Sequence, residues 1–169
     1  RPSAEHLRAL FSGSGSDRLI LLATHTCQLR CAYCRVRKYG ASMDAETAEA
    51  GVRWLMRSLR RDVELQFFGG EPLLALSVVR GAAELAERLA GEAGKTVRFL
   101  LTTNGLALDA AAVAFLRERR FSVEVSCDGT MSAQDAQRPM ARGTGSWSAL
   151  RDGLERLRRA EVPYQVIAV

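Results

Sequence analysis

Residues 19–34 read LILLATHTCQLRCAYC, an apolar run of strand length followed directly by three cysteines. Cys27, Cys31 and Cys34 are separated by three and then two residues, so one loop can wrap its thiolates around one face of a compact soft-metal centre. A structural zinc site normally needs four ligands, whereas an iron–sulfur cubane held by three cysteines leaves one iron open to an external ligand. The spacing predicts such a cluster; the alternatives are a zinc site completed by His25 and unligated thiols.

The order of apolar run and helical segment continues along the chain. After residues 19–23, runs of strand length lie at residues 63–68, 97–101, 121–125 and 164–169. The residues that mark the beginnings of the four intervening amphipathic segments are Ser42 or Asp44, Pro72, Asp109, and Ser146 or Ser148. The residues predicted to face inward from these helices are Ala48, Val52, Leu55 and Leu59; Val78, Ala82, Leu85 and Leu89; Ala112, Val113 and Leu116; and Leu150, Leu154 and Leu157.

Strands separated by helices of this length form right-handed βαβ units, which predicts an α/β fold with a parallel sheet. Two architectures fit: a doubly wound open sheet and a closed or partly closed barrel. Periodicity does not choose between them. In both, functional groups collect at the carboxyl ends of the strands, so the residues that follow each apolar run are the candidates for a site.

Composition excludes several classes of protein. The chain has 169 residues, 47% hydrophobic and 25% charged, which is ordinary for one globular domain. Residues 11–17 (FSGSGSD) predict a linker that follows a short helix or appendage at residues 1–10. No run approaches the roughly 18 apolar residues of a membrane span and no secretory leader opens the chain, so we expect a cytoplasmic protein without a membrane partner.

The net charge of +5 comes mostly from arginines in the helical segments. Solvated helix faces explain it better than a nucleic-acid surface, so no nucleic-acid partner is expected. Of the four cysteines, three lie within eight residues, which in a reducing compartment favours metal binding over disulfides. Cys127 stands apart from them, and we expect it to be buried and unligated.

Polar or glycine-rich residues follow the second and third runs. Gly69 and Gly70 would let a ligand approach bare backbone, and Glu71 could accept a hydrogen bond from an amine or anchor its loop. A plain turn before a helix explains the same residues. The segment 102–105 (TTNG) carries hydroxyl and amide groups suited to a ribose or a carboxylate, although an Asn-Gly turn alone would account for it.

Taken together, these motifs resemble the radical S-adenosylmethionine (SAM) superfamily. The triple cysteine and the FGGEPLL segment carry the resemblance, which covers residues 19–169. TTNG, the Ser-x-Asp-Gly of residues 126–129, the Asp-x-x-Arg of residues 135–138 and the segment GTGSW narrow it to the branch of SPASM-domain and anaerobic sulfatase-maturase-like enzymes. The implied fold is a partial (β/α)6 TIM-like barrel. Residues 18–169 would supply about five of its units, incomplete at the C-terminus, after an appendage and linker at residues 1–17.

The resemblance also implies roles for individual residues. Cys27, Cys31 and Cys34 would ligate a [4Fe–4S] cluster whose fourth iron chelates the amino and carboxylate groups of SAM. The residues implied around SAM are Tyr33 near the adenine, the backbone of Gly69 and Gly70 at the amino group with Glu71 supporting that loop, Thr103 and Asn104 on the floor, Ser126 at the ribose or carboxylate, Asp128 in the following turn and Arg138 at the carboxylate. Gln28, Thr130 and Gln134 stand where the family usually has Asn, Pro and His.

The implied function is that of a radical SAM enzyme acting on peptides or proteins. Its reduced cluster would cleave SAM to a 5′-deoxyadenosyl radical, which takes hydrogen from the substrate during formation of a crosslink, a thioether or a formylglycine. Implied partners are the peptide or protein substrate and a one-electron reductant such as flavodoxin or ferredoxin. The motifs identify no catalytic acid or base for the substrate step. Such a group could belong to the part of the barrel or the C-terminal domain that residues 18–169 do not include. The competing hypotheses are a zinc-stabilised binding module and an inactive radical SAM-like scaffold.

Overall fold

The computed structural model describes residues 15–168. Predictions for residues 1–14 lie outside this part of the chain. The strands are β1 (Arg18–Thr24), β2 (Asp62–Gly69), β3 (Thr96–Thr103), β4 (Ser122–Ser126) and β5 (Tyr164–Ile167). The helices are α2 (Ala45–Met56), the 3-10 turn η1 (Pro72–Ala75), α3 (Leu76–Glu92), α4 (Ala110–Glu118), α5 (Met131–Gln137) and α6 (Trp147–Arg159).

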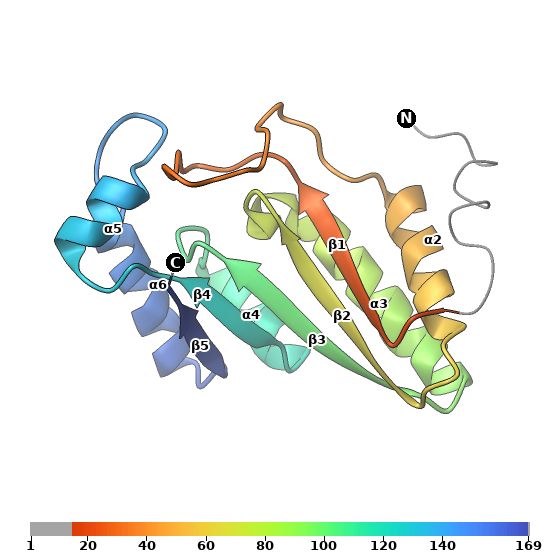
Figure 1. The fold of residues 1–169 in the computed structure, drawn as a ribbon. Helices are drawn as coiled ribbons and strands as arrows, with labels where there is room; N and C mark the ends of the chain where they lie inside the picture. The colour runs from red at the N-terminus through yellow and green to blue at the C-terminus, as the bar shows by residue number, and fades with distance from the viewer. Residues whose placement is uncertain (1–14, 169) are drawn as a thin grey trace.

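The strand order decides between the two predicted architectures. All neighbouring strands pair in parallel, and their order in the sheet is β1-β2-β3-β4-β5. Helices α2, α3, α4 and α6 cover one face of this sheet (Figure 1). A doubly wound sheet reverses its strand order and carries helices on both faces, whereas consecutive order with helices outside is the winding of a barrel. Since β1 and β5 remain edges of the described sheet, the predicted partial barrel is confirmed.

The strand side chains alternate between the two faces of the sheet. Leu21, Leu65, Phe67, Leu101 and Val125 are buried against the helices. Four phenylalanines form the centre of this core. The ring of Phe121 lies 5.0 Å from Phe99, 5.4 Å from Phe115 and 6.0 Å from Phe67, centroid to centroid. Phe121 was predicted inside the fourth strand; it lies one residue ahead of β4 and packs where α4 turns into the sheet.

Helix starts follow the predicted caps. The carboxylates of Asp44 and Asp109 accept hydrogen bonds from the N–H groups of Thr47 and Ala112, so each satisfies a donor that has no partner within its helix. Ser146 occupies the cap position of α6 without a side-chain bond to that helix. Its hydroxyl instead accepts from Gln134, a fully buried side chain that ties α5 to α6.

The helices differ from the prediction in three respects. Leu59 does not face the core: α2 ends at Met56, the chain turns towards β2, and Leu59 is 94% exposed. In α3 the fully buried stripe consists of Val79, Ala82, Ala83, Ala86 and Ala90, and the predicted Val78, Leu85 and Leu89 pack against the core as partly buried side chains at its margins. Small side chains let this helix approach the sheet closely. Helix α5 was not predicted, because its sequence MSAQDAQ has no apolar periodicity.

The helix arginines pair with acidic neighbours on solvated surfaces. Arg88 contacts Glu92 at 2.8 Å, and Glu155 contacts both Arg158 and Arg159. Within residues 15–168, every helix is too short or too polar to cross a bilayer.

Two helical glycines provide a matched test of the packing. A Cβ at Gly153 of α6 would lie 2.1 Å from the carbonyl oxygen of Gly105, whereas one at Gly81 of α3 would meet nothing within 4 Å. We expect Gly153→Ala to lower the free energy of unfolding by about 1–3 kcal/mol because backbone must move. Gly81→Ala should raise it by about 0.5–1 kcal/mol by helix propensity alone. Urea denaturation measures both, and equal effects would contradict the described contact of α6 with the turn after β3.

Candidate functional site

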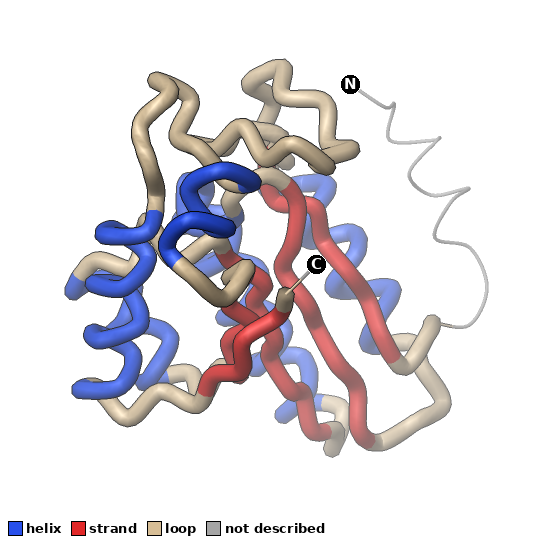
Figure 2. Tube along the Cα trace, turned by 60° about the vertical axis from the view of Figure 1, so that its left-hand side comes forward, coloured by secondary structure: helices blue, strands red, loops and turns tan. Residues whose placement is uncertain are grey.

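The three predicted cysteine ligands line one cavity. It has a volume of about 460 Å³ and lies at the carboxyl ends of the strands, where Figure 2 shows the long loops gathered. Cys27, Cys31 and Cys34 form part of its wall. The other predicted site residues that line it are Tyr33, Gly69, Gly70, Thr103, Asn104, Ser126 and Arg138. Glu71 and Asp128 lie behind this wall and act on residues that line it.

Backbone pairing fixes the cysteine loop over the sheet. The loop leaves β1 and runs above the strand ends towards α5 (Figure 1). The N–H groups of Arg30 and Ala32 donate to the carbonyls of Pro139 and Gln137, each at 2.8 Å. The N–H of Ala141 donates to the carbonyl of Gln28 at 2.7 Å. A segment that follows β4 therefore holds the loop that follows β1, and Leu29 between the first two cysteines is fully buried.

The glycines at the end of β2, Gly69 and Gly70, are required by the close approach of β1 and the loop that follows it. The N–H of Gly70 donates to the carbonyl of Thr24 at 2.7 Å. A Cβ at Gly70 would lie 2.3 Å from the carbonyl oxygen of Thr26, and Gly69 has φ +127°, a conformation that favours glycine. The sequence suggested that these glycines expose bare backbone to a ligand. They do line the cavity, but the N–H of Gly70 is bonded to Thr24 at the end of β1.

Glu71 is a fully buried carboxyl group that connects three loops. It accepts hydrogen bonds from the N–H groups of Leu73 and Asn104 and from the hydroxyl of Thr103, at 2.8 to 3.1 Å. Its own N–H donates to the carbonyl of Thr26 in the cysteine loop. Burial raises the pKa of Glu71 to about 7, although these hydrogen bonds act in the opposite direction. Of its two proposed roles, the structure shows the anchoring one.

Hydrogen-bond donors surround the first cysteine sulfur. The Sγ of Cys27 accepts from the N–H of Leu29 at 3.4 Å and from Nδ2 of Asn104 at 3.5 Å. Such donors stabilise negative charge on a sulfur, as a thiolate ligand requires. Burial raises the pKa of Cys31, while the charges of Arg138 and Lys38 lower it. The donor set around Cys27 suits a thiolate more than a neutral thiol.

Tyr33, Asp128 and Arg138 form a single cluster. The carboxylate of Asp128 accepts from the Tyr33 hydroxyl at 3.0 Å and from Nη2 of Arg138 at 3.0 Å. The guanidinium of Arg138 lies 5.2 Å from the Tyr33 ring centroid, and burial raises the pKa of Tyr33 to about 12. The buried Nε of Arg138 has no hydrogen-bond partner among residues 15–168. A cation that lines the cavity thus keeps one donor free for an acceptor.

Two other predicted residues lie outside the cavity wall. Cys127 is buried, as predicted, and its sulfur accepts from the N–H of Gly129. His25, the fourth ligand of the zinc alternative, contacts the carbonyl of Arg37 through Nδ1 and stacks on Tyr39 at 4.4 Å. In the described part of the chain, no three Cys, His, Asp or Glu side chains converge as ligands of a single ion. The ligands of a cubane each bind a different iron, so they are spread more widely.

Polar strand residues also form part of the cavity wall, and of these the sequence analysis singled out Thr102 but not Gln66 or Glu124. Gln66, Thr102 and Glu124 line it from β2, β3 and β4. Gln66 and Glu124 interrupt otherwise apolar runs, and that interruption was the available signal. Each lies on the face of the sheet opposite the helices, where a polar side chain in a strand has no apolar core to disturb.

Comparison with known proteins identifies the family. A family model for the radical SAM superfamily matches residues 21–169. The chain belongs to the radical SAM superfamily. It is similar to the serine-type anaerobic sulfatase-maturating enzyme of Klebsiella aerogenes, 32% identical over 150 residues, which are 85% of this chain and 37% of the enzyme. A GTP 3′,8-cyclase of Rhodococcus opacus is 32% identical over 133 residues, 76% of this chain and 36% of the cyclase.

The fold agrees with a solved member of the predicted branch. The structure described as native anSMEcpe with bound AdoMet and Kp18Cys peptide superposes with a TM-score of 0.81 and 28% identity. The match covers 89% of this chain and 42% of that chain, so the present chain spans less than half of this relative. These matches confirm the predicted family and branch. The cofactors of the family are a [4Fe–4S] cluster and SAM, as the motifs predicted.

The raised pKa of Glu71 predicts how stability depends on pH. Between the ordinary carboxyl pKa of 4.5 and about 7, the folded state retains a proton that the unfolded chain releases, so the free energy of unfolding falls as pH rises. Glu71→Gln should remove this slope. It should also cost about 1–3 kcal/mol at pH 5, because the amide –NH2 cannot accept from a backbone N–H.

Urea denaturation between pH 4.5 and 8 measures both effects. Glu49→Gln, which removes an exposed carboxylate from α2, is the matched control and should leave the slope unchanged. A Glu71→Gln protein that keeps the wild-type slope would contradict the assignment of the titration to Glu71.

Proposed function

We propose that the protein carrying this chain is a radical SAM enzyme that modifies a peptide or protein substrate. The observation that carries the proposal is one cavity lined by the three spaced cysteines, by the Gly69-Gly70 corner and by a buried arginine with a free donor. Thiols and a guanidinium that converge on one space suit a cluster ligand set and an anionic group of a small molecule.

The residues present fit both cofactors of the family. Cys27, Cys31 and Cys34 would hold the [4Fe–4S] cluster, and Asn104 would stabilise the Cys27 thiolate through its Nδ2 donor. The unsatisfied Nε of Arg138 would donate to the SAM carboxylate, with Asp128 holding the guanidinium in place. Tyr33 would lie beside the adenine, and Gly69, Gly70, Thr103 and Ser126 would complete the SAM site.

When bound, the cluster and SAM supply a one-electron reductive cleavage that generates a 5′-deoxyadenosyl radical for hydrogen abstraction. The chain's own residues position these groups and shield them. Glu71 holds the glycine corner against the cysteine loop, and the pairing of residues 28–32 with residues 137–141 closes the loop over the strand ends. A one-electron reductant such as flavodoxin or ferredoxin would reduce the cluster. The free cysteines of the described chain suit a reducing, cytoplasmic compartment.

The test of cofactor chemistry uses the full-length protein reconstituted anaerobically with iron and sulfide. We expect at least about four irons per chain, visible absorbance and reductive cleavage of SAM. Cys27→Ala, Cys31→Ala and Cys34→Ala should each abolish cleavage. Cys127→Ala is the matched control and should cleave SAM like the wild type, because its sulfur lies outside the cavity wall. One zinc per chain, or cleavage by the three ligand variants, would contradict the proposal.

The substrate class is supported by the sulfatase-maturating relatives and by the peptide in the solved structure's description. The similarity to a GTP 3′,8-cyclase indicates the competing class of substrate, a nucleotide. The reconstituted enzyme is incubated with a peptide digest of deuterated proteins from the source organism. We expect the 5′-deoxyadenosine that forms to contain deuterium taken from these peptides. Deuterium transfer from deuterated GTP instead would overturn the peptide assignment and leave the cofactor assignment standing.

Asn104 makes a further prediction about the cluster. An N–H···S bond stabilises the more negative, reduced state, so its removal in Asn104→Ala should lower the reduction potential. A redox titration followed by electron paramagnetic resonance measures the shift. Ser126→Ala is the control, since Ser126 lines the same cavity and has no hydrogen bond to a cysteine sulfur in the described residues. A potential that rises or stays constant in Asn104→Ala would contradict this role.

A further inference from the structure

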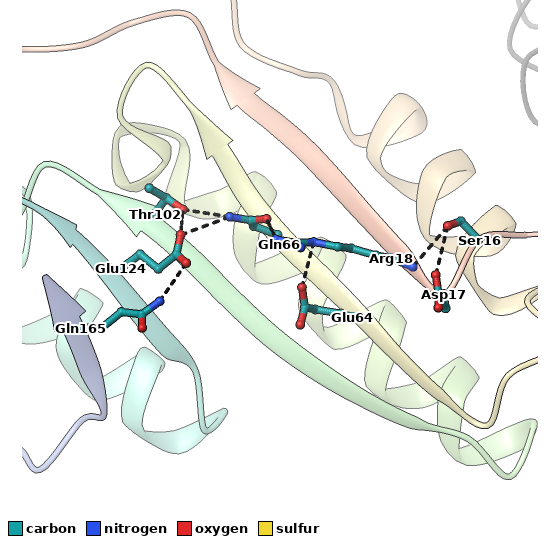
Figure 3. A network of polar contacts seen from close by, with 8 residues as sticks. All are labelled: Ser16, Asp17, Arg18, Glu64, Gln66, Thr102, Glu124 and Gln165. Carbon is teal, nitrogen blue, oxygen red and sulfur yellow. Dashed lines mark hydrogen bonds and ion pairs between the residues drawn. The ribbon is translucent and has the colours of Figure 1, made fainter. Parts of the chain in front are cut away.

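A row of polar side chains crosses the face of the sheet that the helices leave uncovered. It contains one residue from each strand: Arg18, Gln66, Thr102, Glu124 and Gln165 (Figure 3). Because side chains alternate along a strand, these residues all point away from the helical core. The register places Thr102 opposite Glu124, and Glu124 opposite Gln165.

The hydrogen bonds of this row point towards one carboxylate. Nη2 of Arg18 donates to Oε1 of Gln66, which orients the Gln66 amide with its nitrogen towards β3 and β4. Nε2 of Gln66 then donates to the Thr102 hydroxyl at 2.9 Å and to Oε2 of Glu124 at 3.3 Å. The Thr102 hydroxyl itself donates to Oε2 of Glu124 at 2.7 Å. On the other side, Gln165 donates to Oε1 at 3.0 Å. Glu124 is the acceptor on which the donors of the row converge.

Glu124 retains both a free acceptor position and an unpaired charge. A carboxylate has about four lone-pair sites, and the three hydrogen bonds leave one of them open on Oε1. All three donors are neutral. No lysine or arginine of residues 15–168 forms an ion pair with Glu124, whereas Glu64 on the same face pairs with Arg18 at 2.9 Å. Arg35, Lys38 and Arg138 line the same cavity, and none of them forms an ion pair with Glu124. The carboxylate of Glu124 is therefore held in place by the row without an ion-pair partner among residues 15–168.

This charge faces the cavity that contains the cysteines. Glu124 lies two residues before Ser126 on the same face of β4, a separation of about 6.6 Å along the strand. Phe68 and Ile167 contribute apolar surface to the same cavity, and a less polar environment strengthens a charge–charge interaction. A substrate that covered Glu124 without a compensating cation would bury an unpaired carboxylate, which is costly.

We propose that Glu124 determines substrate specificity by receiving a cationic side chain, the ammonium of a lysine or the guanidinium of an arginine, from the peptide that enters the cavity. The inference rests on the proposed function and names the chemistry of its substrate. Gln66, Thr102 and Gln165 position the carboxylate, and Arg18 orients Gln66. A partner of this class fills the open acceptor site and neutralises the charge in one contact.

The test uses the full-length enzyme, reconstituted anaerobically and loaded with SAM, to select from a library of random peptides displayed on their encoding RNA. The wild type should enrich lysine or arginine at one peptide position by roughly tenfold, the effect of one charge-assisted hydrogen bond. Glu124→Gln should lose this enrichment, and Glu124→Lys should replace it with enrichment of aspartate or glutamate. Glu64→Gln removes a carboxylate from the same face, outside the cavity, and should keep the wild-type preference.

The visible absorbance of the cluster shows which variants fold and take up the cluster. If Glu124→Lys does not fold, Glu124→Gln alone provides the test. Wild-type selection without enrichment of basic residues, or equal enrichment by wild type and Glu124→Gln, overturns the inference. Cleavage of SAM by the wild type is measured in the same preparation. An enzyme that cleaves SAM and shows no charge preference contradicts only the role of Glu124, whereas one that cannot cleave SAM contradicts the proposed function.

Discussion

The buried carboxyl group of Glu71 is the constraint on which the site depends. Its backbone N–H holds Thr26 of the cysteine loop, and its side chain holds the N–H of Asn104 at the end of β3. Asn104 in turn donates to the sulfur of Cys27. Glu71, which follows β2, therefore fixes both the loop of cysteines after β1 and the Asn104 donor after β3. The cost of burying this carboxyl is visible in its raised pKa, and the hydrogen bonds that it accepts offset that cost.

The winding of the sheet brings these groups together. Parallel strands in consecutive order place every carboxyl end at the same edge, so loops that are far apart in sequence become neighbours. The helices cover only one face, which leaves the alternate residues of each strand free to carry polar groups. That second face holds the polar row whose donors converge on Glu124 (Figure 3), and Glu124 lines the same cavity as the three cysteines. The same alternation thus separates the apolar core from the polar wall of the cavity.

Local patterns predicted most of the elements, because caps and apolar periodicity depend on neighbours in sequence. Asp44 and Asp109 are such caps, and the five apolar runs all became strands. Predictions failed where tertiary contacts decide. Leu59 continues the helical spacing, but the chain has already turned towards β2. The contact of Gly70 with Thr26 depends on which loop lies above it, and no local pattern contains that information.

The loop of three cysteines could be predicted because the spacing of Cys27, Cys31 and Cys34 is itself local, whereas the cavity wall opposite them could not. Nothing in the local sequence shows what Glu124 contacts. Its hydrogen bonds to Thr102 and Gln165 depend on the register between the strands. The family resemblance supplied the role of Arg138, and the structure adds that one of its buried donors is unsatisfied. A cofactor motif can therefore be read from local sequence spacing, whereas the proposed role of Glu124 becomes visible only once the register of the strands is known.

Crystallography at the iron absorption edge tests the central claim most directly. The full-length protein, reconstituted and crystallised anaerobically with SAM, should show anomalous density for an iron cluster bonded to Cys27, Cys31 and Cys34, with SAM between it and Arg138. A single zinc ion bound with His25, or a cluster bonded to other residues, would contradict the account.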